Sequence, residues 1–465
     1  MIVARTAVAG IIAGSLYALA GDVPSRDAQY QADAPLAIVD VTVIPVVTAG
    51  MLPRQTVLIR DGRIIAVGSR ASVRLPGNAR VIDGRGKFLV PGLVDAHVHL
   101  EEVADLPQFV AAGVTTVRDL MGSPETLAWR KNTADGTVVG PRVIAAGPLF
   151  AGPQVPWRKK FVTEDPDSAR AEVRRQHAAG YDLVKIYDGL TAPVYAAVMD
   201  EVHALGLTAT GHIPAAVHLS GVLAAKQNLE HTDKIAFDVF NGTPDTTRID
   251  SVARAIAAAG VFVTPTIASM QQLARVGSGA FDSLLARPEA RRAGPVTLDV
   301  WCTYTVRLRG TRTVPAGTRY NRGTDFQMRI VDAERRAGVA ILAGTDYPNA
   351  MLAPGGSLIE EMIALRESGL SSADALRAAT LTAGRAIGDS TSGLIRAGAR
   401  ADLVLVGGNP LDDLHALSRV DAVVLNGRWL SRAALDSIAP LPAAAPSCPG
   451  STPRRAGPTD ADTGQ

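Results

Sequence analysis

Residues 90–99 form an apolar run that closes with a His-x-His pair: Val90-Pro91-Gly92-Leu93-Val94-Asp95-Ala96-His97-Val98-His99. This pattern predicts a buried strand with polar residues at its end. Side chains at positions i and i+2 of a strand point to the same side, so His97 and His99 can bind one metal ion together. A helix does not bring two imidazoles together at that spacing. The run therefore predicts a strand that leads into a metal site.

The middle of the chain alternates strand patterns with helix patterns. The expected strands are residues 93–98, 115–120, 143–149, 183–187, 208–212, 228–231, 261–267 and 339–345. Helix-like stretches rich in Ala, Glu and Arg, such as 168–179 and 192–205, separate most of them. This alternation predicts an α/β fold, a (β/α)8 TIM barrel. A doubly wound open sheet is the alternative, but no Gly-x-Gly-x-x-Gly turn follows an early strand.

Short β-rich runs flank this region on both sides. Asp61-Gly62 and Asn426-Gly427 each lie between two such runs and predict hairpin turns. We therefore expect a small β-sandwich domain built from residues 36–90 and 394–435. The barrel would occupy residues 91–393.

The two ends of the chain have compositions of their own. Arg5 precedes an apolar run over residues 7–20 that ends in Ala18-Leu19-Ala20, an A-x-A cleavage pattern. The run is shorter than the roughly 20 apolar residues of a membrane span. It therefore predicts a signal peptide over residues 1–20 and an exported protein, periplasmic or secreted, rather than an uncleaved anchor. Residues 439–465 are rich in Pro, Ala, Ser and Gly and predict a disordered tail.

Composition narrows the class of protein. With 465 residues, 47% of them hydrophobic and 20% charged, the chain matches a soluble globular enzyme. A net charge of +2 and 5% aromatic residues argue against nucleic-acid binding. The cysteines, Cys302 and Cys448, can pair in an oxidising compartment, but they imply no disulfide framework.

On a barrel, one set of side chains falls at or near the carboxyl ends of the strands, where barrel enzymes keep their active sites. The set is His97, His99, Lys185, His212, His231 and Asp346. Nitrogen and carboxylate ligands of this kind favour zinc, with manganese, iron or cobalt as alternatives. The ordered set predicts a metal-dependent hydrolase.

Several motifs resemble those of the amidohydrolase superfamily. Residues 90–99 resemble its opening motif, and further matches are Thr210-Gly211-His212, Leu229-Glu230-His231, Ala343-Gly344-Thr345-Asp346 and Gly398-Ala399-Arg400-Ala401-Asp402-Leu403. Val184-Lys185-Ile186-Tyr187 is similar to the branch with Xaa-Pro dipeptidases (prolidases), ochratoxinase-type amidases and imidazolonepropionase-like proteins. The resemblance covers about residues 37–430.

The resemblance implies two divalent metal ions, zinc in the first instance. It assigns the more buried ion to His97, His99 and Asp346, and the second ion to His212 and His231. Lys185, carboxylated by CO2 to a lysine carbamate, would bridge the two, because a plain ammonium group would be repelled by the cations. A hydroxide shared by the ions would attack a polarised carbonyl, and Asp346 would move its proton to the leaving nitrogen.

Substrate contacts are harder to assign from the sequence. The resemblance suggests that Tyr187, on the same face as Lys185, contacts the substrate, although it could also fill the barrel rim. His218, in the loop after the fifth strand, would face the mouth of the site or lie away from it. The long excursion over residues 268–338 carries Arg307, Tyr320 and Arg322, any of which could grip a substrate carboxylate. Arg118 could contact the substrate or form a structural pair.

The sequence thus predicts a hydrolase that cleaves an amide or peptide C–N bond in a small molecule, a dipeptide or an N-acyl amino acid. Opening of a cyclic amide and hydrolysis of a lactone or ester are alternatives within enzymes. An inactive barrel that serves as a scaffold is the alternative outside them. We expect no nucleic-acid partner and no membrane association after signal cleavage, and the sequence leaves homo-oligomers open.

Overall fold

The computed structural model describes residues 34–157, 159–310, 316–349 and 351–448, without the side chains of residues 304–322. The expected signal peptide, residues 1–20, lies outside the described residues. The same holds for residues 449–465 of the expected disordered tail. Among the described residues, no helix combines the length and apolar character needed to cross a bilayer.

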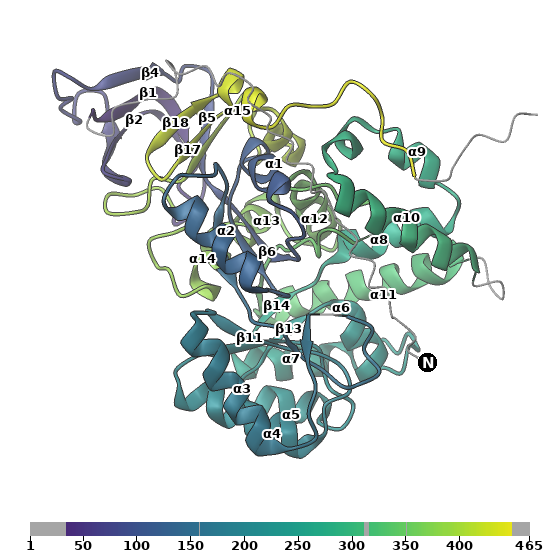
Figure 1. Cartoon of the computed structure of the whole chain (residues 1–465). Helices are drawn as coiled ribbons and strands as arrows, with labels where there is room; N and C mark the ends of the chain where they lie inside the picture. Colours follow the sequence, from purple (N-terminus) through teal and green to yellow (C-terminus); the bar gives the residue numbers. More distant parts are fainter. Residues whose placement is uncertain (1–33, 158, 311–315, 350, 449–465) are drawn as a thin grey trace, which may run out of the picture.

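A small sheet takes strands from both ends of the chain (Figure 1). Its strands are β1 (Leu36–Val43), β2 (Leu52–Arg60), β3 (Arg63–Ser69), β4 (Arg80–Asp83), β5 (Phe88–Pro91), β16 (Leu403–Val406), β17 (Val420–Leu425) and β18 (Arg428–Ser431). They follow the order β18-β17-β16-β5-β1-β2-β3, with β4 paired to β1. The two predicted hairpin turns are confirmed: Asp61-Gly62 joins β2 to β3 and Asn426-Gly427 joins β17 to β18, all four residues at positive φ.

Parallel strands fill the middle region, and all those predicted there are present. They are β6 (Leu93–Val98), β7 (Val114–Asp119), β8 (Arg142–Ala145), β11 (Leu183–Ile186), β12 (Thr208–Gly211), β13 (Asn228–Glu230), β14 (Phe262–Thr264) and β15 (Ala340–Ile341), with β9 (Leu149–Phe150) and β10 (Lys160–Phe161) added. One sheet has the order β6-β7-β8 and the other β10-β9-β11-β12-β13-β14-β15. Isolated parallel bridges, Ala146 to Leu183 and Val98 to Tyr347, connect the two. The architecture is therefore α/β with an additional small sheet.

Helices connect the parallel strands. They are α1 (Leu106–Ala111), α2 (Pro124–Ala134), α3 (Pro166–Ala179), α4 (Ala192–Ala204), α5 (His218–Ala224), α6 (Thr232–Lys234), α7 (Ile249–Ala259), α12 (Gly356–Glu367), α13 (Ser372–Ala378), α14 (Leu381–Ala386) and, near the C-terminus, α15 (Arg432–Ile438). Local signals explain helix α3, where the Asp165 carboxylate accepts two backbone N–H groups and Pro166 takes the first position. Gly180, in the left-handed region, ends it.

The excursion after β14 is a helical insertion with its own core. It consists of α8 (Ile267–Gly277), α9 (Phe281–Leu285), α10 (Pro295–Gly310) and α11 (Ala316–Ala337), drawn in green on the right of Figure 1. Its buried apolar residues include Leu273, Phe281, Leu284 and Trp301, which form a cluster separate from the main core. The insertion can therefore hold a fixed shape beside the strands.

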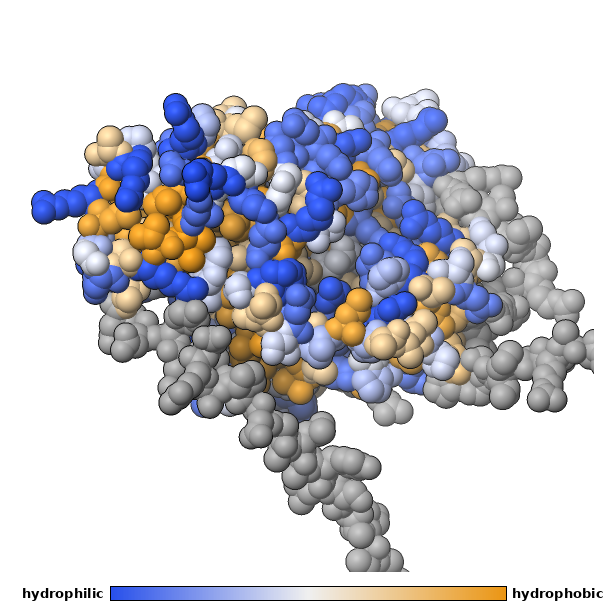
Figure 2. All heavy atoms as spheres, turned by 90° about the horizontal axis from the view of Figure 1, so that it is seen from above, coloured by the Kyte–Doolittle hydropathy of each residue, from blue (hydrophilic) through white to orange (hydrophobic). Residues whose placement is uncertain are grey.

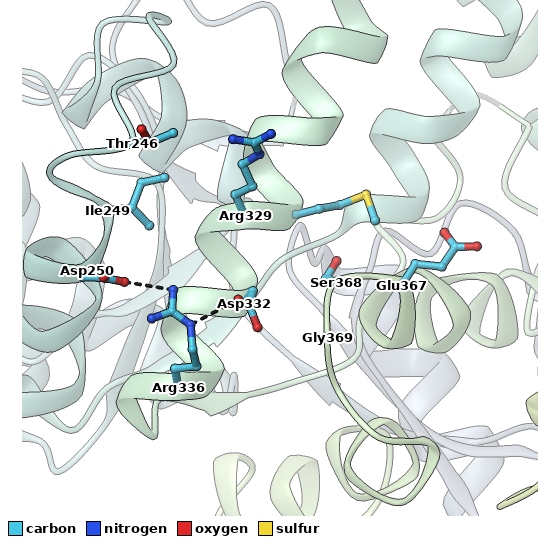
Figure 3. Close-up of a pocket in the computed structure, with 10 residues that line it drawn as sticks. Thr246, Ile249, Asp250, Arg329, Asp332, Arg336, Glu367, Ser368 and Gly369 are labelled. Atoms are coloured by element: carbon cyan, nitrogen blue, oxygen red, sulfur yellow. Dashed lines mark hydrogen bonds and ion pairs between the residues drawn. The ribbon is translucent and has the colours of Figure 1, made fainter.

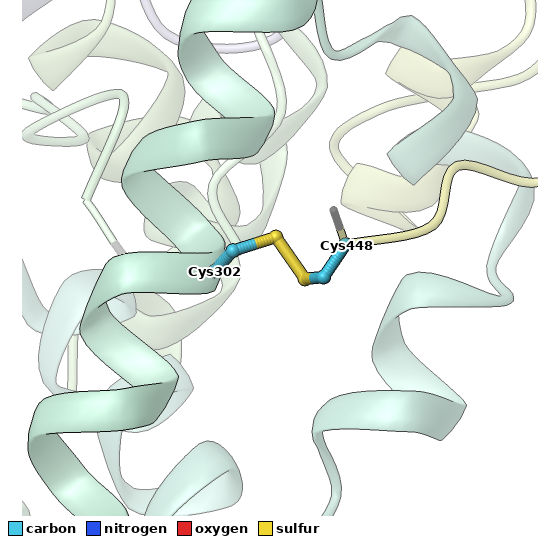
Figure 4. The surroundings of a disulfide bond; sticks show 2 residues. All are labelled: Cys302 and Cys448. Atoms are coloured by element: carbon cyan, nitrogen blue, oxygen red, sulfur yellow. A yellow bond between two sulfur atoms is a disulfide. The ribbon is translucent and has the colours of Figure 1, made fainter. Parts of the chain in front are cut away.

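A disulfide fastens the C-terminal segment to this insertion. Cys302 on α10 and Cys448 are bonded across 146 residues of sequence (Figure 4). Both side chains pack against the apolar cluster of the insertion. The pairing that the sequence left open is therefore present.

Apolar side chains also reach the surface. Figure 2 shows them gathered over the small sheet. The exposed large hydrophobic residues of that part are Val47, Met51, Leu52 and Val81.

The burial of Glu334 on α11 can be tested through the pH dependence of stability. Both its carboxylate oxygens are buried without a hydrogen-bond partner in the described structure, and burial raises the pKa of Glu334 to about 8. Between the ordinary glutamate pKa and pH 8, unfolding releases a proton, so stability should fall as the pH rises through this window. Glu334→Gln should remove this part of the fall in stability with pH. The difference in melting temperature between pH 5 and pH 8 measures it.

The matched control is Glu164→Gln, at an exposed position, which should keep the wild-type slope. An unchanged slope in Glu334→Gln would show that Glu334 is solvated and charged.

Candidate metal centre

The ends of the parallel strands bring four imidazoles together. His97 lies in β6 and His99 directly after it, while His212 follows β12 and His231 follows β13. The ring centroid of His97 lies 5.1 Å from that of His99 and 4.6 Å from that of His231. The rings of His231 and His212 are 5.0 Å apart. Residues far apart in the sequence thus form one continuous cluster.

Asp346, which follows β15, completes this cluster. Its Oδ1 lies 3.0 Å from Nε2 of His99 and 3.3 Å from Nε2 of His97. Ligands at zinc distances in a tetrahedral arrangement lie about 3.4 Å apart, so these separations fit one ion. The ligand atoms of all three residues lie within 4.8 Å of one another. His97, His99 and Asp346 can therefore hold a metal ion.

The backbone is arranged to bring these ligands close. Asp346 has φ of 66° and His231 has φ of 67°, a conformation that non-glycine residues rarely adopt and that is concentrated at functional sites. Gly344, two residues before Asp346, lies against the backbone of His97. A Cβ at Gly344 would stand 2.8 Å from the His97 nitrogen, so only glycine allows the approach.

A buried ion pair orients His97. Its Nδ1 lies 2.8 Å from Oε2 of Glu230, whose other oxygen accepts a hydrogen bond from Arg118 at 2.6 Å. Thr210 also donates to Glu230, and Arg118 donates to the carbonyl of Ala96. A carboxylate on Nδ1 fixes the imidazole so that Nε2 faces the metal. Of the two roles open for Arg118, the structure shows the structural pair.

The other two histidines are held in the same way. Nδ1 of His212 lies 3.0 Å from Oδ1 of Asp188, and Lys234 donates to Oδ2 of Asp188 at 2.9 Å. Nδ1 of His231 lies 2.9 Å from the hydroxyl of Thr266. In both rings Nε2 is therefore left for a ligand role.

The residues present fit a metal. Nε2 of His97, Nε2 of His212 and Nζ of Lys185 are buried and make no hydrogen bond within the described structure. Burial lowers the pKa of His212 to about 4 and those of His97 and His231 well below the ordinary value, so these rings are neutral, as ligands must be. Burial also lowers the pKa of Lys185 to about 8.

A cavity of about 230 Å³ opens onto this centre. Lys185, Tyr187, His99, His212, His231 and Asp346 line it together with Glu101, Asp233, Lys234 and Asn349 and a set of apolar residues. A larger cavity, of about 550 Å³, lies between α7 and α11, where Arg336 pairs with Asp250 and Asp332 (Figure 3). None of the clustered histidines lines it, so the smaller cavity is the candidate site.

Of the predicted substrate contacts, the structure brings only some to the cavity. Tyr187 lines the cavity, and its ring lies 3.9 Å from that of His212. His218 begins α5 and is not among the described lining residues. The side chains of Arg307, Tyr320 and Arg322 lie outside the described residues.

Sequence reasoning missed Asp188 and Lys234. Lys234 stands one helical turn after His231, and Asp188 follows Tyr187, so both were within reach of an argument from spacing.

Comparison with known proteins agrees with this geometry. Residues 88–430, more than half of the chain, match the amidohydrolase family. The chain belongs to the amidohydrolase family. The resemblance seen in the sequence motifs is thereby confirmed. The family is metal-dependent and acts on small molecules, and His97, His99 and Asp346 are arranged so that they could hold an ion.

Individual relatives are distant but cover most of the chain. An uncharacterized protein of Mycobacterium tuberculosis is 27% identical over 410 residues, 81% of this chain and 93% of the relative. The solved structure of a bottromycin amidohydrolase has a TM-score of 0.70 at 26% identity and covers 86% of this chain and 88% of its own. The solved structure of a prolidase-like protein from Bifidobacterium longum has a TM-score of 0.67 at 24% identity and covers 87% of this chain and 98% of its own. The last likeness concerns the fold alone.

Asp188 tests the support of His212. Asp188→Ala removes the acceptor on Nδ1, so the metal at His212 and His231 should bind about 10–100-fold more weakly. Asp188→Asn keeps an acceptor and should retain most of the affinity. Competition with a graded series of chelators, read as bound zinc per chain, measures the change. The control is Asp200→Ala, an acid whose side chain is 64% exposed. Wild-type affinity in both Asp188 variants would mean that His212 needs no such support.

Proposed function

We propose that this chain is a two-metal amidohydrolase that cleaves the amide or peptide C–N bond of a dipeptide or an N-acyl amino acid. The parallel strands would close into a (β/α)8 barrel, supported by the bridges on both sides of β6-β7-β8 and by the fold shared with other amidohydrolases. The metal ligands would then occupy the carboxyl-end face, where barrel enzymes keep their chemistry.

One observation carries the proposal. The imidazoles of His99, His212 and His231 line one cavity together with Asp346 and Lys185, and the ring of His97 adjoins that of His231. The amine of Lys185 has no hydrogen-bond partner among the described residues. A buried ammonium without a hydrogen-bond partner is costly, which favours another state of Lys185. A lysine carbamate is such a state. It forms when the neutral amine attacks CO2 and releases a proton. Burial lowers the pKa of Lys185, which makes the neutral amine easier to reach than in an exposed lysine.

Each residue has a defined task in this mechanism. His97, His99 and Asp346 would hold one ion, His212 and His231 the other, and carboxylated Lys185 both. When bound, two divalent ions, zinc in this proposal, would polarise the substrate carbonyl and activate a water for attack.

Asp346 would take the proton of that water and deliver it to the leaving nitrogen. Asn349, which donates to the other oxygen of Asp346, keeps the carboxylate in place. Tyr187, whose ring lies against that of His212, would contact the substrate carbonyl.

Export is part of the proposal. The leader pattern over residues 1–20 supports it, and the Cys302–Cys448 disulfide is typical of proteins in oxidising compartments. N-terminal sequencing of the protein recovered from the cell envelope or medium tests it. A mature chain that still begins at Met1 would contradict it.

The direct test is a screen of dipeptides and N-acyl amino acids with zinc and bicarbonate present. Release of a free amine, at a rate that follows zinc content, is the expected result. A protein loaded with about two ions per chain that cleaves none of these amides would overturn the proposed function.

Lys185→Ala should bind about one ion instead of about two and lose most turnover while keeping its fold, because the bridging group is gone. Metal analysis and circular dichroism measure both effects. Lys131→Ala, at an exposed position, should match the wild type. Unchanged turnover in Lys185→Ala would remove the carbamate from the mechanism.

Asp346→Asn should keep part of the metal but lose roughly 10²–10⁴-fold in kcat, because the amide cannot accept the proton. Turnover measured at equal zinc occupancy separates lost chemistry from lost metal. A drop below tenfold would assign Asp346 to metal binding alone.

A further inference from the structure

Apolar residues line part of the cavity. One group consists of Met121, Leu149 and Trp157, which come from the segment after β7, from β9 and from the loop after β9, and which cluster with Tyr187. A second group consists of Met270, Leu273 and Val300, which come from helices α8 and α10 of the insertion. We call these the strand wall and the insertion wall.

The two walls belong to different apolar clusters. The strand wall extends a cluster around Leu149, Ala151 and Val155. The insertion wall extends the separate core of the helical insertion. In each cluster the central residues are buried, whereas Met121, Trp157, Met270 and Val300 at the cavity are only partly buried. Each cluster thus leaves apolar surface facing the cavity, and an apolar group placed there would remove that surface from water.

The insertion wall is fixed relative to the metal ligands. The Glu102 carboxylate accepts the backbone N–H of Val296 at the start of α10. The hydroxyls of Thr297 and Tyr347 lie 2.6 Å apart, and Trp301 donates to the carbonyl of Pro348 at 3.0 Å. Tyr347 and Pro348 directly follow Asp346, so α10 is bound to the same loop that carries this ligand.

The disulfide adds a further restraint. Cys302 lies two residues beyond Val300 on α10, and its bond to Cys448 holds this part of the helix to the C-terminal segment. The insertion wall is therefore preformed rather than assembled around a ligand.

Two of the charged groups that line the cavity are already paired. Lys234 is paired with Asp188 at 2.9 Å, and Glu101 lies 3.5 Å from Lys159. Between the walls, Trp157 alone among the six residues carries a side-chain polar hydrogen. A polar group placed there would lose its water without gaining equivalent hydrogen bonds.

We propose that the strand wall and the insertion wall form a specificity site for an aliphatic or aromatic side group of the substrate, next to the scissile amide. The inference rests on the proposed amide hydrolysis and narrows its substrates to small amides with one apolar side group. The volume of about 230 Å³ supports a small substrate, because pockets for drug-sized ligands usually span roughly 300–1,000 Å³.

The first arm of the test compares near-isosteric side groups on the zinc-loaded wild-type protein. Leucine and asparagine are placed in turn on each side of a glycine dipeptide. We expect kcat/KM for the better leucine peptide to exceed that for its asparagine counterpart by about tenfold or more. Equal values on both sides of the amide would overturn the inference and leave the proposed function standing.

The second arm uses two valines on one helix. Val300 lines the cavity, whereas Val296, one turn earlier on α10, is 42% exposed and does not line it. Val300→Asp should lower kcat/KM for the leucine peptide by about tenfold or more and bring the leucine-to-asparagine ratio close to one. Val296→Asp should keep both values. Equal behaviour of the two variants would contradict the insertion wall.

Two further measurements keep the result interpretable. If Val300→Asp does not fold, Met270→Gln takes its place, because Met270 is partly buried and glutamine is of similar length. It should shift the leucine-to-asparagine ratio of kcat/KM in the same direction. Calorimetric binding of N-acetyl-leucine and N-acetyl-asparagine to the zinc-loaded protein separates the two proposals. Preferential binding of the leucine compound without turnover of any amide would support the specificity site and overturn the hydrolase. Equal binding would overturn the site itself.

Discussion

The carboxylate of Asp95 joins β6 to the segment after β15 at the level of the metal ligands. One oxygen accepts the N–H of Thr345 at 2.9 Å, and the other accepts its hydroxyl at 2.8 Å. The N–H of Asp346 donates in turn to the carbonyl of His97 at 2.7 Å. Asp95 is fully buried, so water does not compete for these bonds. Without this junction, Asp346 would not lie beside His97 and His99.

The same region shows how buried charge is made tolerable. An unpaired ion in an apolar interior is strongly unfavourable, and Glu230 is fully buried. Arg118 neutralises it, and the remaining acceptor capacity serves Thr210 and His97. The charge pair therefore has a use beyond stability, because it fixes the ring of a metal ligand. Lys185 is the exception in this region, since Nζ has no hydrogen-bond partner among the described residues, and that exception motivates the proposed carbamate.

Local sequence patterns predicted the elements that carry the site. His97 and His99 were recognisable from strand periodicity, and Gly344-Thr345-Asp346 from its position after an apolar run. The hairpin turns at Asp61-Gly62 and Asn426-Gly427 followed from turn chemistry alone. In each case the signal lies within a few residues of the feature that it predicts.

Features that depend on distant contacts were not predictable in this way. The partner of Cys302 lies 146 residues away, and the path of the C-terminal segment back to α10 leaves no local signal. The roles of Arg118 and Glu361 also depend on which strand or helix end they meet in space. Glu361 on α12 accepts the N–H of Ala268 at the start of α8, next to Thr266, which contacts His231. Periodicity shows that such residues lie inward, but not which group they meet.

The insertion has consequences for both binding and chemistry because of where it is attached. Helix α10 supplies Val300 to the cavity and is bonded to the loop after Asp346 through Thr297 and Trp301. A shift of α10 would therefore move a specificity residue and a proposed proton carrier together. Such coupling favours a rigid attachment, and the disulfide between Cys302 and Cys448 provides one. Changes of substrate preference are accordingly easier at Met270 on α8, which lies outside this set of bonds, than on α10 itself.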